Sequence, residues 1–179
     1  LVKAGVKELL VISQDTSAYG VDIKYKLDFW GGRPIKSRMQ ELCEALGELG
    51  VWVRLHYVYP YPHVDNVISL MAEGKILPYL DIPFQHGSPS VLARMKRGYT
   101  VDDYRRLVGR IRARVPEVGI STDIIVGFPG ETEEQFMDTY RLMDELQPDM
   151  IRIAKYSERP QTLASRHYPD DVPPEEKER

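Results

Sequence analysis

Five short apolar segments alternate with helical patterns along this chain, and this alternation limits the possible folds more than any other feature. The expected strands span 7–13, 51–59, 79–85, 119–126 and 149–156, with apolar residues at helical spacing between them. Strands that each follow a helix form a parallel sheet with right-handed crossovers. An α/β fold follows, either a doubly wound sheet or part of a (β/α) barrel.

Polar or aromatic residues stand at the end of every expected strand. They are Gln14-Asp15, His56-Tyr57, Gln85-His86, Gly127-Phe128 and Tyr156-Ser157. A ring of such groups at the carboxyl ends of strands is typical of a barrel. No glycine-rich dinucleotide fingerprint follows the first strand, so we favour the barrel.

Residues 121–132 combine a strand, a glycine-rich turn and a helix start. The turn holds two glycines and a proline, which allow a tight bend and the close approach of a ligand. Thr132 and Gln135 form a capping box that begins the next helix. The alternative is a plain strand-to-helix connection. The residues predicted at a ligand-binding face are Asp123, Gly127, Gly130 and Glu131.

Composition narrows the protein class. The chain has 179 residues, a net charge of −3 and one cysteine. It therefore has no internal disulfide, no multi-cysteine metal site and no basic footprint for nucleic acid. We expect Cys43 to be a buried, inert helix residue. No apolar run is long enough to span a membrane and no signal peptide is visible, so we expect a cytoplasmic protein.

Less regular segments predict the remaining organisation. Residues 14–34 are expected to form a polar loop, and Ser37 to cap a helix that runs to Gly50. Residues 1–5 resemble the last turn of a helix and 173–179 the first turn of another. We therefore expect a piece of a longer protein, with a core domain over 1–168 and the start of a linker over 169–179.

Two strands carry candidate binding groups. Arg54 and His56 share a strand face, which favours a carboxylate clamp if that face is covered; outward-pointing side chains are the alternative. Gln85 can donate and accept hydrogen bonds, which suits a ribose hydroxyl or an amide. His86 is a candidate base, but a single histidine more often has a structural role.

The aromatic segment 57–63 either stacks on a ligand or a substrate peptide, or packs over the barrel mouth. No Ser-His-Asp set, Cys-His set, P-loop or zinc spacing is present. The residues alone therefore predict a polar barrel mouth without a self-contained catalytic group.

Several motifs make the sequence similar to the radical S-adenosylmethionine methylthiotransferases. They lie at residues 13–20, 54–62, 80–88, 95–99 and 122–132, and the likeness covers nearly the whole chain. It implies a partial (β/α)6 barrel whose first strand and three-cysteine cluster loop lie upstream. It further implies an N-terminal domain with a second cluster and a C-terminal TRAM domain, so this chain alone is expected to be inactive.

The resemblance also implies cofactors and contacts. The cofactors are S-adenosylmethionine and two 4Fe–4S clusters, whose ligand cysteines this chain lacks. No catalytic or metal-binding residue is assigned to this chain. The implied contacts are Ser13, Gln14 and Asp15 with the methionine amino group, Gln85 and Ser88 with the ribose, Asp123, Gly127, Phe128 and Gly130 with the adenosine, and Arg54 and His56 with the methionine carboxylate or the target.

The implied substrate depends on which motif is given more weight. Residues 13–20 and 54–62 resemble the branch that adds a methylthio group to an aspartate of small-ribosomal-subunit protein twelve, which makes the ribosome a partner. Residues 156–164 resemble the branch that modifies adenosine in tRNA, although Gln161 replaces a glycine of that pattern. We favour the ribosomal-protein branch and keep tRNA as the alternative. A non-catalytic barrel that serves as a binding module is a third hypothesis.

Overall fold

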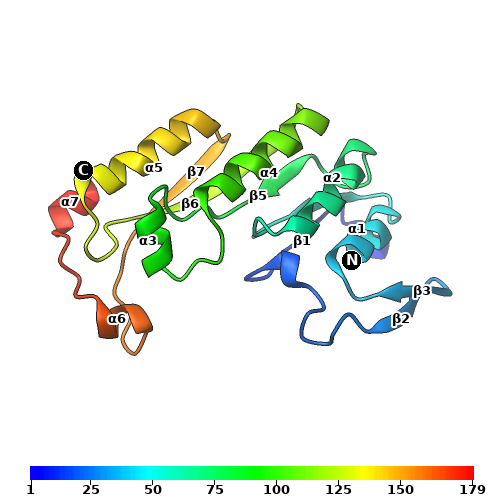
Figure 1. Cartoon of the computed structure of the whole chain (residues 1–179). Coiled ribbons are helices and arrows are strands. Elements are labelled where there is room, and N and C mark those ends of the chain that lie inside the picture. The colour runs from blue at the N-terminus through cyan, green and yellow to red at the C-terminus, as the bar shows by residue number, and fades with distance from the viewer. The chain divides into compact units, whose positions relative to one another are not determined.

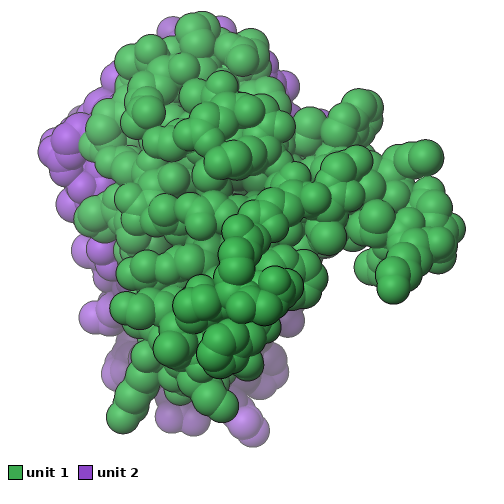
Figure 2. Space-filling view, turned by 90° about the vertical axis from the view of Figure 1, so that its right-hand side faces the viewer, with its two compact units in different colours: residues 1–82, 107–120 green, residues 83–106, 121–179 purple.

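The structure is a computed structural model that describes all 179 residues of an α/β chain (Figure 1). The chain divides into two compact units (Figure 2). Unit 1 comprises residues 1–82 and 107–120, and unit 2 comprises residues 83–106 and 121–179. Every helix is too short or too polar to cross a lipid bilayer.

The predicted parallel sheet is confirmed. Its strands are β1 (Glu8–Val11), β4 (Trp52–Leu55), β5 (Tyr79–Asp81), β6 (Gly119–Val126) and β7 (Met150–Lys155), in the order β1-β4-β5-β6-β7. Pairing is parallel between β1 and β4, between β4 and β5, and between β6 and β7. β6 has the predicted bounds, whereas β5 ends before Pro83, which has no amide hydrogen for a ladder bond.

Unit 1 packs helices against one face of its strands. The elements are the short 3₁₀ turns η1 (Val2–Ala4), η2 (Thr16–Ala18) and η3 (Pro62–Val64) and the helices α1 (Met39–Gly47) and α2 (Asp65–Ala72). Val53 and Leu55 of β4 are 1% exposed and belong to the core. Because strand side chains alternate, Trp52 and Arg54 lie on the opposite face.

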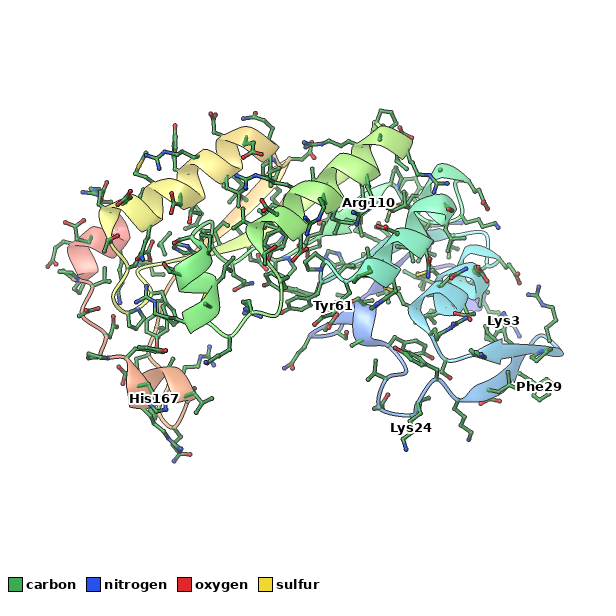
Figure 3. All side chains as sticks on the ribbon, in the orientation of Figure 1. Lys3, Lys24, Phe29, Tyr61, Arg110 and His167 are labelled. Atoms are coloured by element: carbon green, nitrogen blue, oxygen red, sulfur yellow. The ribbon has the colours of Figure 1, made fainter.

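The expected polar loop over 14–34 is wrong in its second half. β2 (Leu27–Trp30) and β3 (Arg33–Lys36) form an antiparallel hairpin there, and the side chain of Phe29 projects from it (Figure 3). Gly31 and Gly32 have φ values of 55° and 78°, as a two-residue hairpin turn requires. Every residue of β2 is exposed, so no alternation of apolar and polar residues marked the strand.

The start of α1 also differs from the prediction. Arg38, not Ser37, is the N-cap, and no side chain caps the helix. The Ser37 amide donates instead to the carbonyl of Lys26, 2.9 Å away, and so continues the hairpin pairing. Cys43 of α1 is fully buried, as predicted.

Unit 2 holds the second group of helices. They are α3 (Pro89–Arg94), the first residues of α4 (Val101–Arg114), α5 (Glu133–Leu146), α6 (Leu163–His167) and α7 (Pro174–Glu178). The capping box of Thr132 and Gln135 forms as predicted, and α5 lies along β6 and β7 (Figure 1). α6 is a short helix that was not predicted. The buried hydroxyl of Tyr104 donates to the carbonyl oxygens of Pro83 and Phe84, 3.1 and 2.9 Å away.

Candidate functional site

In unit 1, the segment after β1 is fastened to the end of β4. The Thr16 amide donates to the Tyr57 carbonyl at 2.9 Å, and its hydroxyl donates to the His56 carbonyl at 2.6 Å. Ser13 and Gln14 are exposed beside this anchor, and the Asp15 carboxylate accepts a hydrogen bond from Ser17. The three predicted contacts with the methionine amino group therefore lie on one loop of fixed position within the unit.

The side chains of Arg54 and His56 are partly buried, and each already has a carboxylate partner. Arg54 Nε lies 2.6 Å from Glu8 Oε1, and the guanidinium stacks 4.7 Å from the ring centroid of Tyr79. His56 Nδ1 lies 3.0 Å from Oδ2 of Asp81, whose side chain is 1% exposed. His56 Nε2 makes no hydrogen bond. The pairing of Arg54 with Glu8 was not predicted, because it depends on the register between β1 and β4.

In unit 2, Gln85 combines a left-handed backbone with a side-chain amide that has no partner within the protein. Its φ is 67°, and its backbone bonds to both sides of Ile124, with 2.8 Å from its amide to the Asp123 carbonyl and 2.8 Å from its carbonyl to the Ile125 amide. The residue is 7% exposed, and its side-chain amide makes no hydrogen bond within the protein. Both amide atoms are accessible from the surface, so they can donate to and accept from a ligand.

Ser88 lies in the same turn. Its residue is 3% exposed, and its hydroxyl has one partner, the Ser90 hydroxyl at 3.2 Å. The Ser88 amide donates to His86 Nδ1 at 2.9 Å. The structure therefore brings the two predicted ribose-binding residues together in one buried turn.

The glycine-rich turn after β6 bends tightly, as predicted, and does so through a left-handed backbone. Gly127 and Gly130 have φ values of 71° and 70°, and Phe128 is 5% exposed. The space beside Gly127 is filled by Lys177 of α7, whose Cγ would lie 2.4 Å from an added Cβ. The Gly130 amide donates to Asp171 Oδ1 at 2.6 Å. The C-terminal segment therefore covers part of this turn.

Asp123 is paired with a cation that sequence reasoning missed. Arg152 of β7 places Nε 2.5 Å from Asp123 Oδ1 and Nη1 2.7 Å from the Ser121 hydroxyl. Asp123 and Arg152 are direct neighbours in the register of β6 and β7. The two residues are 29 positions apart in the sequence, and the pairing of β6 with β7 brings them together.

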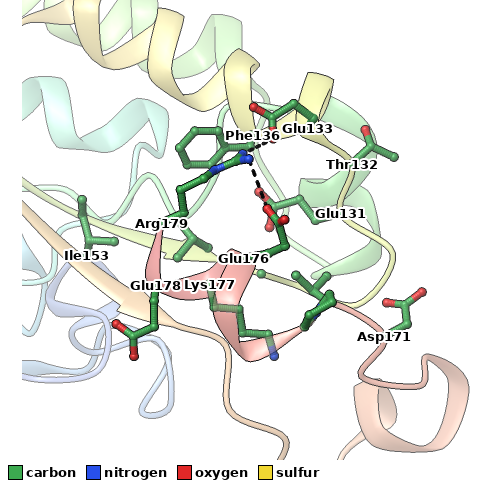
Figure 4. Close-up of a pocket in the computed structure, with 14 residues that line it drawn as sticks. Glu131, Thr132, Glu133, Phe136, Ile153, Asp171, Glu176, Lys177, Glu178 and Arg179 are labelled. Atoms are coloured by element: carbon green, nitrogen blue, oxygen red, sulfur yellow. Dashed lines mark hydrogen bonds and ion pairs between the residues drawn. The ribbon is translucent and has the colours of Figure 1, made fainter.

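Unit 2 also contains a cavity of about 710 Å³ at the end of β6 (Figure 4). Gly127 and Glu131 line one side of it, and residues 171–173 and 176–179 line the other. Arg179 forms ion pairs there with Glu133 and Glu176. No group of three or more His, Cys, Asp or Glu side chains in the structure could hold a metal ion.

Comparison with known proteins supplies the class. The family described as the Radical SAM superfamily matches residues 1–143. The chain belongs to this superfamily. Coproporphyrinogen III oxidase from Escherichia coli, described as a radical SAM enzyme, has the same fold over 78% of this chain and 33% of its own, with a TM-score of 0.62 and 21% identity.

More similar sequences are named "Ribosomal protein uS12 methylthiotransferase RimO". The protein from Hahella chejuensis is 62% identical over 157 residues, which are 88% of this chain and 36% of that protein. The protein from Bordetella pertussis is 58% identical over 182 residues, 100% of this chain and 42% of that protein. The chain therefore spans about two fifths of the length of these relatives.

The superfamily implies S-adenosylmethionine and an iron–sulfur cluster, and the residues of this chain fit the first but not the second. Clusters are held by cysteine thiolates. The single cysteine, Cys43, lies in the core, where burial raises the pKa of its thiol to about 12. The accessible amide of Gln85 and the adjacent Ser88 hydroxyl are, by contrast, groups that suit a ribose.

Proposed function

We propose that this chain is the nucleoside-binding core of a methylthiotransferase that modifies an aspartate of small-ribosomal-subunit protein twelve. The observation that carries the proposal is the 58% identity, over the whole chain, to relatives named for that reaction. The side-chain amide of Gln85 supports it independently, because it makes no hydrogen bond within the protein and can both donate to and accept from ribose hydroxyls.

The proposed roles follow from the donors and acceptors in each unit. When bound, S-adenosylmethionine supplies the carbon radical and the methyl group that this class of reaction uses. In unit 2, the Gln85 amide and the Ser88 hydroxyl bind the ribose hydroxyls. Gly127, Phe128 and Gly130 form the turn along the adenine, and Asp123, held by Arg152, lies on the strand before it. In unit 1, Ser13, Gln14 and Asp15 bind the methionine amino group.

Arg54 and His56 are proposed to meet a carboxylate. The hydrogen bond from Arg54 to Glu8 uses Nε, so the terminal nitrogens of the guanidinium keep donors for a second anion. Asp81 holds His56 through Nδ1, which orients Nε2 as the free end of the ring. These two side chains then bind either the methionine carboxylate or the target aspartate.

The rest of the proposed protein follows from the same family. Residues 1–168 are proposed as the radical SAM core and 169–179 as the start of a linker. Two 4Fe–4S clusters are assigned to segments that carry the ligand cysteines. The ribosome is the proposed partner, and the cytoplasm the proposed location.

The test is to delete the complete gene and to record, from the same cells, the intact mass of small-ribosomal-subunit protein twelve and the masses of the tRNA nucleosides. Loss of the methylthio group from small-ribosomal-subunit protein twelve, with tRNA nucleosides unchanged, is the expected result. Complementation with Gln85→Leu should leave the protein unmodified. The matched control is Gln40→Leu on α1, whose amide bonds only to Glu44, and it should restore the modification. A mass of protein twelve that does not change on deletion would refute the proposal.

Modification of adenosine in tRNA is the second candidate. Gln161 has a φ of 67°, in the left-handed region that glycine occupies most readily. The tRNA-branch pattern has a glycine at this position, and the left-handed backbone of this chain suits one. Loss of a methylthio-adenosine from the tRNA digest, with protein twelve unchanged, would favour this candidate.

A further inference from the structure

Unit 2 buries a histidine–glutamate pair, His86 and Glu131, to which the proposed function assigns no role. His86 is fully buried, and the side chain of Glu131 is 4% exposed. Their contact, 3.0 Å from Nε2 to Oε1, joins residues 45 positions apart in the sequence. A buried carboxylate is costly to desolvate and is tolerated where it is fully hydrogen-bonded.

The hydrogen bonds around this pair define which atom carries the proton. His86 Nδ1 accepts from the Ser88 amide at 2.9 Å, so it is the unprotonated nitrogen. Nε2–H therefore donates to Glu131 Oε1. The other carboxylate oxygen, Oε2, accepts from the Phe128 amide at 2.9 Å. The backbone of one turn, two side chains and the backbone of a second turn thus form one continuous chain of hydrogen bonds.

Each end of that chain lies in a turn that the proposed function uses. The first turn carries Gln85 and Ser88, and the second carries Gly127 and Phe128. Gln85 holds a left-handed φ of 67°, a conformation that a non-glycine residue keeps only when its surroundings impose it. Backbone pairing between the two segments ends at Gln85 and Ile124. Beyond that point, the contact between the side chains of His86 and Glu131, here called the bridge, joins the two turns.

We propose that His86 and Glu131 are positioning residues that set the spacing between the two halves of the nucleoside site. This inference rests on the proposed function. The ribose-binding turn and the adenine-binding turn must be held at a fixed separation to bind one rigid nucleoside. A preformed site avoids the cost of ordering loops when the ligand binds. Neither side chain need touch the ligand, since His86 belongs to the first turn and Glu131 holds the second turn through the backbone amide of Phe128.

Two amide substitutions of His86 each keep one of its two side-chain hydrogen bonds and remove the other. In His86→Gln the side-chain amide can still donate to Glu131, and the bridge persists. In His86→Asn the shorter side chain can still accept from Ser88, but the bridge to Glu131 is broken. We expect His86→Asn to weaken binding of S-adenosylmethionine and of S-adenosylhomocysteine by about tenfold, the effect of one lost buried hydrogen bond, and His86→Gln to stay within about threefold of wild type.

The measurement is calorimetric titration of both nucleosides into the full-length, cluster-reconstituted protein, with thermal unfolding recorded in parallel. Tyr104→Phe is the matched control, because it removes buried hydrogen bonds to Pro83 and Phe84 in the same unit without touching the bridge. It should lower stability and leave both dissociation constants unchanged. A general loss of stability would instead weaken binding in the control as well.

Two results would overturn the proposal. One is a folded His86→Asn protein whose two dissociation constants equal those of wild type. If that variant does not fold, Glu131→Gln decides, because its amide has one acceptor oxygen for two donors; unchanged binding there would equally refute the proposal. The proposed function fails separately, when wild-type protein binds the nucleosides but protein twelve keeps its modification after gene deletion.

Discussion

Gly87, between His86 and Ser88, is a position where one added methyl group should be strongly destabilising. A Cβ there would lie 2.5 Å from Thr139 Cα, 2.6 Å from the Thr139 nitrogen and 2.6 Å from the Asp138 carbonyl oxygen. All three are backbone atoms of α5, so no side-chain rotation relieves the contact. Reaching an ordinary separation of 3.4 Å from Thr139 Cα requires a displacement of about 0.9 Å between the turn and the helix.

The magnitude follows from two effects of that displacement. Overpacking against a rigid neighbour costs about 1–3 kcal/mol. The Gly87 amide also donates to the Thr139 hydroxyl at 2.9 Å. Stretching this bond costs about 1 kcal/mol more. We therefore expect Gly87→Ala to destabilise this region by about 3 kcal/mol, which accelerates amide exchange in α5 by roughly 150-fold.

The assay is hydrogen exchange followed by mass spectrometry on peptides that cover α5 and residues 85–88. Gly109→Ala is the matched control, because Gly109 lies inside α4 and an added Cβ meets no atom within 4 Å. Replacing a helical glycine by alanine should stabilise α4 by about 0.5–1 kcal/mol. Exchange in α5 that is unchanged by Gly87→Ala would refute the steric argument.

Further predictions concern three other positions. Gly127→Ala should destabilise the protein through its clash with Lys177 and its φ of 71°, and adding Lys177→Ala should recover only the steric part, as a thermal-unfolding double-mutant cycle will show. Cys43 should resist iodoacetamide at pH 8 in the folded protein, because raising its pKa from 9.0 to about 12 leaves roughly a thousandth of the thiolate of a free thiol; peptide mass spectrometry checks this, and rapid labelling would contradict it. Thr132→Ala should cost about 1 kcal/mol of stability by removing the cap that accepts from Gln135, while Thr132→Ser should be near neutral in denaturant unfolding.

The parallel sheet and its main helices could be predicted from the sequence because their signals are local. β6 has the predicted bounds and α5 begins at the predicted capping box, since a β-branched run, a glycine turn and a capping box follow one another directly. The hairpin of β2 and β3 was missed because its side chains are exposed and carry no periodicity. Ser37 was wrongly predicted as a cap because that hairpin takes its amide.

Candidate ligand residues were recognisable from their types and positions, but their partners were not. The sequence by itself determined the α/β class, the strand ends where polar groups gather and the tight glycine turn after β6, because hydrophobic periodicity and backbone freedom are properties of neighbouring residues. Only the tertiary structure decided that Arg54 meets Glu8, that Asp123 meets Arg152 and that His86 meets Glu131. These pairs depend on strand register and on turns packed together from distant parts of the chain, and no local pattern encodes a contact between residues 29 to 46 positions apart.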